Sequence, residues 1–276
     1  MLNEKRFHFL TQEYQLKLVT SAEEIEALKE VRRATLVQRY QQVSPIQNEE
    51  EILFNDDDKQ SFIYLLQHKK SQQYVGAVRL FFINSLTPLQ RLPMESYGVN
   101  AIDDYTQEKP IAEISRGALI KELPSHPDFS GLEIRTMLTF NLMVATRLNM
   151  LLYPYKQLFC IMEPALHRIL SRQNARLEQI GKPVEYYGLR TPYALSKEVL
   201  LKATHQSMDR LTKYYLNTLR SPTNPFYAFV KAHPYLKIEE IQSVERILNE
   251  YDTTHYTTEA HKRDSRPSPT QSQTLN

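Results

Sequence analysis

The stretch from residue 111 to residue 162 constrains the fold more than any other part of the chain. Residues 111–120 read IAEISRGALI, a run that predicts a β-strand. From 132 to 150, apolar residues recur at the spacing of a buried helix, and 158–162 is a short apolar run typical of a strand. A strand, a helix and a second strand in this order imply a crossover unit in a sheet.

Regular elements are also predicted before this unit. Alternating apolar residues predict a strand over 14–20, and a serine–glutamate capping box predicts a helix over 21–40. Residues 62–66 and 74–82 predict a β-hairpin. The polar, proline-containing stretch 41–55 predicts a long surface loop.

After the unit, a proline at a first-turn position predicts a helix over 164–173, and two further strands are predicted over 184–187 and 193–201. The whole order indicates an α/β (α+β) fold, with a mixed central sheet flanked by helices.

Composition divides the chain into three parts. The β-rich order fills residues 1–203, which we expect to form one domain. Residues 204–252 have an amphipathic, helical pattern and predict a C-terminal helical appendage. Residues 253–276 are polar and rich in Pro, Ser and Thr, which predicts a disordered tail.

The totals exclude several classes of protein. Lys plus Arg number 34 against 32 for Asp plus Glu, so the net charge of +2 gives no signal for nucleic acid. A single cysteine, Cys160, excludes an intrachain disulfide framework. With no secretory signal pattern and no transmembrane segment of about 18 apolar residues, we expect a cytoplasmic protein.

Several stretches together resemble a known group of enzymes. They are Arg32 and Arg33, the acidic triplet 56–58, GAVRLF at 76–81 and EISRGALI at 113–120, followed by IMEPALHRIL at 161–170 and IGKPVEYYGLRTPY at 180–193. In this order they resemble the acyl-homoserine lactone synthases. The last two stretches are more similar to the N-acyl amino acid synthases and the acyltransferases associated with the PEP-CTERM/exosortase system.

The resemblance implies a GNAT-like fold and an N-acyltransferase. Such an enzyme moves a fatty acyl group from an acyl carrier protein thioester, or from acyl-CoA, to the primary amine of an amino acid or related amine. No permanently bound cofactor is implied. In such folds two central strands diverge and admit the pantetheine arm of the donor; here they would be 111–120 and 158–162.

The chain has no Trp, although the lactone synthases carry a signature Trp, which disfavours S-adenosylmethionine as acceptor. A lactone-type autoinducer synthase and a non-catalytic acyl-binding protein stay open as alternatives.

Glu113 is the candidate catalytic base. An amine attacks a thioester only as the free base, so a carboxylate must take up a proton. Strand alternation places Glu113 and Ser115 on one face and Ile114 and Arg116 on the other, unless a bulge shifts the phase. An exposed strand carboxylate without function is the alternative interpretation of Glu113.

The charged residues around it have two interpretations each. Arg79 and Arg116 either contact substrate or form a buried ion pair, for which Asp57 and Asp58 are the candidate partners of Arg116. Those two carboxylates either hold the acceptor amine or pair with arginines such as Arg32 and Arg33, the other candidate substrate-binding residues. A solvated turn is the third interpretation of the acidic triplet, and no metal site is predicted.

Three basic residues are candidates for docking the acidic carrier protein, or else ordinary solvated charges: Arg135, Arg147 and Lys156.

Four apolar residues of the predicted helix over 132–150 either line an acyl tunnel or pack the core: Met137, Phe140, Leu142 and Met143. Cys160, inside a predicted strand, is expected to be a buried, inert thiol. The HxxxD match of His205 and Asp209, a pattern found in another class of acyltransferases, is short and is attributed to chance.

Overall fold

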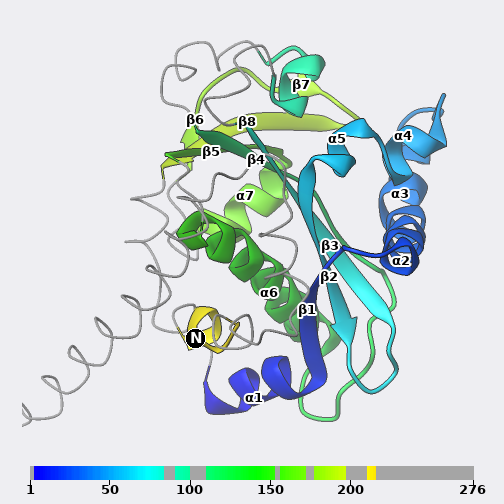
Figure 1. Ribbon diagram of the computed structural model, residues 1–276, viewed down its shortest axis with the longest axis vertical. Helices are drawn as coiled ribbons and strands as arrows, with labels where there is room; N and C mark the ends of the chain where they lie inside the picture. Colours follow the sequence, from blue (N-terminus) through cyan, green and yellow to red (C-terminus); the bar gives the residue numbers. More distant parts are fainter. Residues whose placement is uncertain are drawn as a thin grey trace, which may run out of the picture.

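The computed structural model describes residues 3–83, 91–99, 110–152, 156–171, 177–196 and 210–215. Within these ranges a mixed sheet forms the centre of the protein, in the strand order β1-β2-β3-β4-β5-β8-β6, with β7 paired to β8 (Figure 1). The strands are β1 Tyr14–Leu18, β2 Ser61–His68, β3 Tyr74–Ile83, β4 Ile111–Leu119, β5 Gln157–Met162, β6 Glu178–Gln179, β7 Val184–Glu185 and β8 Leu189–Ser196. The predicted mixed sheet with flanking helices is therefore confirmed.

Helices cover both faces of this sheet (Figure 1). On one side lie α1 Glu4–Glu13, α6 Gly131–Leu152 and α7 Pro164–Ser171. On the other lie α2 Ala22–Arg32, a π-helical turn η1 Arg33–Val37, α3 Gln38–Gln41, α4 Glu49–Leu53, α5 Asp56–Lys59 and, toward the β7 end, the 3-10 turn η2 Pro93–Tyr97. The predicted capping box is present at the start of α2, where Ser21 and Glu24 bond each other's backbone N–H groups. None of the described helices is both long and apolar enough to cross a membrane.

Burial on both faces explains the composition of the central strands. In β2 the alternate residues Phe62 and Tyr64 belong to the main core beneath α6, whereas Ile63 and Leu65 pack with α2. Both sets are at most 2% exposed. A strand covered on both sides needs a continuous apolar run, since each large side chain contributes about 1.5–3 kcal/mol on burial.

The central strands β4 and β5 run parallel but stay paired over only three residues each. The ladder joins Ile111–Glu113 to Gln157–Phe159, and beyond it β4 continues against β3 alone while β5 continues against β8. Helix α6 makes the crossover between them, as a parallel pair requires. The predicted divergence of these two strands is confirmed, and the last paired residue of β4 is Glu113.

Some elements differ from the prediction. Helix α1 was not predicted; Asn3 caps it, and its Phe9 and Leu10 enter the main core. The loop predicted over 41–55 contains α4, which forms because Ile52 and Leu53 are buried against η1 and α3. The acidic triplet is not a solvated turn but the one-turn helix α5.

Residues 210–215 are the described part of the predicted C-terminal appendage, and they are helical. Leu211 and Tyr215 are buried in the main core, and Arg210 forms an ion pair with Glu4 of α1. This short helix therefore packs against α1 and α6 (Figure 1). The rest of the appendage, the tail 253–276 and the His205–Asp209 match lie outside the described residues.

Candidate active site

A buried charge cluster lies where α2 and α5 meet the sheet. Asp58 of α5 accepts two hydrogen bonds from Arg32 of α2, at 2.7 and 2.9 Å, and one from Arg116 of β4 at 2.7 Å. Arg79 of β3 approaches the same carboxylate at 3.4 Å. The side chains of Arg32 and Asp58 are 0% exposed and that of Arg79 is 2% exposed. All three arginines are therefore ion-paired with Asp58.

A β-bulge brings Arg116 to this cluster. The β3–β4 register passes from Arg79–Ser115 to Ala77–Ala118, so β4 holds one extra residue, and Arg116 takes a positive φ of 52°. Ser115 and Arg116 therefore project from the same face, and Arg79 donates to the Ser115 hydroxyl at 3.0 Å. Strand alternation would place Arg116 on the opposite face from Glu113, but this bulge shifts the phase. Arg116 therefore shares the face of Glu113.

The electrostatics of Asp58 follow from its three cations. Burial alone would raise the pKa of this carboxyl, but Arg32, Arg116 and Arg79 outweigh that effect and lower it to about 2. Its side chain also closes the capping box of α5 by accepting from the backbone N–H of Asn55 at 3.0 Å. Asp58 is therefore ionised at any working pH and holds α2, α5, β3 and β4 together.

Glu113 lies in the same cluster but has a different environment. Its side chain is 1% exposed, so the interpretation as an exposed strand carboxylate is wrong. One oxygen accepts from the backbone N–H of Met94 in η2 at 2.7 Å, while the other stays 4.0 Å from Arg79. Burial raises the pKa of Glu113 to about 7, against the lowering effects of Arg79, the Met94 N–H and Ser115.

A carboxyl with this pKa can exchange a proton near neutral pH, which a general acid or base requires. It also occupies the position where β4 and β5 separate. Of the sequence candidates, the structure thus brings together Glu113, Arg79, Arg116, Asp58 and, at the end farther from Glu113, Arg32.

Three other charged candidates lie at the edge of the cluster: Asp56, Asp57 and Arg33. Asp57 has a side chain 38% exposed and lies 3.9 Å from Arg79. Asp56 is exposed and pairs with Lys59 at 2.7 Å. Arg33 does not pair with the triplet, which was one of the alternatives; it turns outward to Glu49 at 3.0 Å, and both side chains are at least 40% exposed.

Sequence reasoning missed a group of tyrosines beside the cluster. Tyr97 of η2 stacks on Tyr186 with ring centroids 3.8 Å apart, and Tyr40 of α3 stacks on Tyr187 at 4.1 Å. Tyr186 also meets Tyr40 edge-on at 5.9 Å. The guanidinium of Arg190 lies 5.7 Å from the rings of Tyr40 and Tyr186.

An ion-pair bridge extends this group to β5. Glu163, directly after β5, pairs with Arg190 of β8 at 3.3 Å and also with Arg39 of α3. The quoted runs IMEP and YYGLR were the available signal, since they contain Glu163, Tyr186, Tyr187 and Arg190. Their mutual contact could not be seen from spacing.

The three predicted docking residues do not share one surface. Arg147 is 3% exposed and donates to the Thr212 hydroxyl at 3.3 Å, so its predicted place at a docking surface is wrong. Lys156 is exposed at the start of β5. Arg135 lies in the first turns of α6 and donates to the backbone carbonyls of Ile120 and Lys121, both at 2.8 Å.

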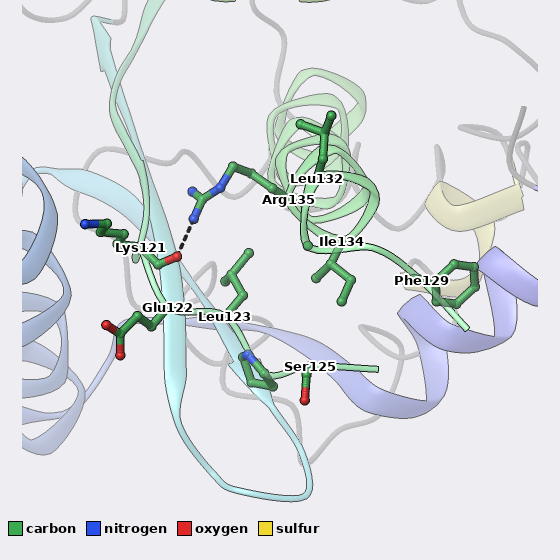
Figure 2. A pocket seen from close by; sticks show the side chains of 10 residues that line it. Lys121, Glu122, Leu123, Ser125, Phe129, Leu132, Ile134 and Arg135 are labelled. Carbon is green, nitrogen blue, oxygen red and sulfur yellow. Dashed lines mark hydrogen bonds between the residues drawn. The ribbon is translucent and has the colours of Figure 1, made fainter. Parts of the chain in front are cut away.

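Arg135 also lines a hollow of about 420 Å³ between the end of β4 and the start of α6. Figure 2 shows it reaching from the helix to the Lys121 carbonyl, above Leu123 and Ile134. Of the four residues considered for an acyl tunnel, Met137 and Leu142 are buried in the main core, and Phe140 packs against it. Met143 packs against Cys160 in a smaller cluster.

The remaining predictions concern a nucleophile and a metal. Cys160 is 5% exposed, and burial raises its pKa to about 12, which confirms the inert thiol. Among the described residues, no group of three or more His, Cys, Asp or Glu side chains could hold a metal ion.

No protein-family model matches the chain, and no curated protein matches it. Among solved structures, the chain is similar to FeeM, an N-acyl amino acid synthase from uncultured soil microbes, with 15% identity and a TM-score of 0.49 over 69% of this chain and 94% of that one. It is also similar to the AHL synthase LasI, with 16% identity and a TM-score of 0.46 over 67% and 89%. The third is MesI, a CoA-dependent acyl-homoserine lactone synthase, with 14% identity and a TM-score of 0.46 over 73% and 95%. Identities of 14–16% with TM-scores below 0.5 do not by themselves show which reaction this protein catalyses.

Proposed function

We propose that the protein is an N-acyltransferase that moves a fatty acyl group from a thioester to a primary amine, with Glu113 as general base. One observation carries this proposal: a buried carboxyl with a pKa raised to about 7 lies where two parallel strands separate. Such a group is poised to accept a proton at neutral pH, and the separating strands offer a place for an extended donor.

The reaction makes a simple demand on Glu113. The amine nitrogen attacks the thioester carbonyl carbon, a C–N bond forms, and the C–S bond breaks. Glu113 accepts the proton that the nitrogen loses and then gives it up, directly or through water, to the leaving sulfur, which becomes a thiol. The carboxyl thus returns to its starting state after each turnover. Removing such a base typically slows a reaction by about 10²–10⁴-fold.

The donor side of the proposal rests on the free edge of β4. Beyond Glu113 this strand pairs with β3 alone among the described strands, and residues 114–117 are less buried than the residues before them. Unpaired strand backbone can bond an extended amide-containing chain, and a pantetheine arm is such a chain.

We further propose acyl carrier protein as the natural carrier of the donor, with acyl-CoA as the alternative. Arg135 and the exposed Lys156, which do not share one surface, are alternative candidates for docking it through attraction to an acidic partner. The acceptor would be an amino acid or related amine, and the reaction would take place in the cytoplasm. Membership of the exosortase-associated branch stays a prediction that neighbouring genes can test.

The test is turnover by the purified protein. Acyl-carrier-protein and acyl-CoA donors of several chain lengths are incubated with a panel of amines, and products are identified by mass spectrometry. We expect an N-acyl amine and a loss of about 10²–10⁴-fold in rate for Glu113→Gln. Glu26→Gln is the matched control, because it makes the same change on an exposed residue of α2 that pairs with Lys29 on the surface.

The outcomes separate the alternatives. A lactone product with release of methylthioadenosine would show an autoinducer synthase instead. Binding of acyl donor without turnover for any amine would favour an acyl-binding protein and contradict the proposal. An unchanged rate for Glu113→Gln would show that another group is the base.

A further inference from the structure

The turn η2 contacts the candidate base from outside the sheet. The backbone N–H of Met94 donates to Glu113 at 2.7 Å, and the Met94 side chain is 0% exposed. It packs in one cluster with Phe81, Ile111 and Phe159 from the three strands around Glu113. The other oxygen of the Glu113 carboxyl lies 4.0 Å from Arg79.

Tyr97 holds the other end of this turn. The turn is closed by Glu95, whose carboxylate accepts from the N–H of Leu92 at 2.5 Å, and it ends at Gly98 with a φ of 84°. Tyr97, the last residue of the turn, stacks on Tyr186 at 3.8 Å with the rings 28° apart.

Tyr186 is itself anchored by β8. Arg190 donates to the backbone carbonyl of Tyr186 at 2.8 Å and pairs with Glu163 at 3.3 Å. Through Tyr186, η2 is thus connected to β8 and to the end of β5, on the far side of the point where β4 and β5 separate.

From these contacts we propose that Tyr97 is a positioning residue: its stack on Tyr186 holds η2 in place, and η2 holds the Glu113 carboxylate through the Met94 N–H. The catalytic consequence rests on the proposed function, but the effect on the carboxyl itself does not. The residue acts through η2 and not on substrate.

The sign of the effect follows from the groups that face Glu113. They are Arg79 from β3, Ser115 from β4, Asp57 from α5, Cys160 from β5, and Tyr97 and the Met94 N–H from η2. The Met94 bond favours the ionised carboxyl and lowers its pKa, so losing that bond raises the pKa further. The rising limb of a pH–rate profile then moves to higher pH, because the base is ionised only above its pKa.

The experiment compares Tyr97→Leu, which removes the ring, with Tyr97→Phe, which keeps it. For each variant, Tm is measured from pH 5 to pH 9 with and without an added Glu113→Gln change. The slope of the difference between the two curves falls to half at the folded-state pKa of Glu113, so this pH, the titration midpoint, is obtained without any need for activity. We expect the midpoint to rise by about one pH unit in Tyr97→Leu, the size expected for loss of one hydrogen bond.

The conservative change and a matched control define the specificity. Tyr97→Phe should keep the wild-type midpoint to within about 0.3 pH units, since the stack persists. Tyr74→Leu removes a half-buried tyrosine of β3 that contacts Lys17, away from the cluster, and should also leave the midpoint unchanged. If Tyr97→Leu does not fold, Tyr186→Leu removes the stack from the other side and carries the same expectation.

A midpoint that stays at the wild-type value in the folded Tyr97→Leu or Tyr186→Leu protein overturns the proposal. A midpoint that rises equally in Tyr74→Leu overturns it as well, because the effect is then a general loosening. If the midpoint moves as expected but wild type acylates no amine, the positioning role stands and the proposed function fails. With an active enzyme, the pH–rate profile of Tyr97→Leu should shift by the same amount as the midpoint.

Discussion

The charge cluster holds one buried carboxyl at each end, Asp58 and Glu113, and the pKa values of the two are shifted in opposite directions. Asp58 accepts hydrogen bonds from three arginines, and its pKa is lowered to about 2. Glu113 has one arginine at 4.0 Å, and its pKa is raised to about 7. Burial raises the pKa of both, so the number and closeness of the cations decide the outcome.

This difference assigns each carboxyl a separate task. A carboxylate with a pKa of about 2 cannot accept a proton from an amine at neutral pH, but it can hold three guanidinium groups in place. In the proposed function Glu113 accepts that proton, because a weakly paired carboxyl in a buried site exchanges protons near pH 7. Environments that push two neighbouring pKa values apart are how one site separates structure from chemistry.

The largest effect is expected at the Asp58 end. Asp58→Asn leaves three arginines, two of them buried, without their shared anion, which should lower the free energy of unfolding by about 3–5 kcal/mol. Urea unfolding at pH 7 measures it. Asp56→Asn is the matched control and should stay within about 0.5 kcal/mol, because Asp56 is exposed.

The pH dependence of the same variant sharpens the comparison. The pKa of Asp58 is lower in the folded protein than its ordinary 3.8, so its contribution is present above that value and is lost as pH falls toward about 2. The Asn variant should lack this loss between pH 4 and pH 2. A wild type whose acid unfolding curve parallels that of Asp58→Asn would show that Asp58 is not held ionised by the arginines.

At the Glu113 end the sign is opposite. The folded-state pKa of about 7 exceeds the ordinary 4.5, so the contribution of Glu113 to stability is full below pH 4.5 and is lost as pH rises through 7. Glu113→Gln stays neutral and should therefore be more stable than wild type at pH 8, by on the order of 2–3 kcal/mol. At pH 4 the two should match.

Thermal unfolding of wild type and Glu113→Gln between pH 4 and pH 9 checks this expectation. Glu122→Gln, an exposed change beside the hollow at α6, serves as control and should show no such pH-dependent gain. A Gln variant less stable than wild type at pH 8 would mean that the Glu113 carboxylate is paired as strongly as that of Asp58.

Much of this arrangement could be predicted because it depends on local patterns. The strand, helix and strand over 111–162 follow from periodicity, and EISR places Glu113 on the correct strand. The direction of Arg116 is different, since it depends on a positive φ at a non-glycine residue. The available signal is the neighbouring Gly117, because a glycine inside a strand pattern often marks a bulge.

The rest depends on contacts between distant segments, which spacing does not encode. Arg147 has the sequence context of a solvated helix charge, yet residues 210–215 cover it. Tyr97 and Tyr186 are 89 residues apart in the sequence. They meet because β8 lies beside β5. Arg32 and Arg33 look equivalent in sequence, but only one of them faces the sheet.

That last pair gives the smallest expected effect. Arg33 pairs with Glu49 at 3.0 Å, where both side chains are at least 40% exposed, so Arg33→Gln should change the free energy of unfolding by less than about 0.5 kcal/mol. The same change at the adjacent position, Arg32→Gln, removes a fully buried partner of Asp58 and should cost several times more. Urea unfolding of both variants at low and high salt measures the contrast, because salt screens only the exposed pair effectively. Equal losses for the two would place Arg33 in the cluster and would remove the distinction between the buried anchor and the surface charge beside it.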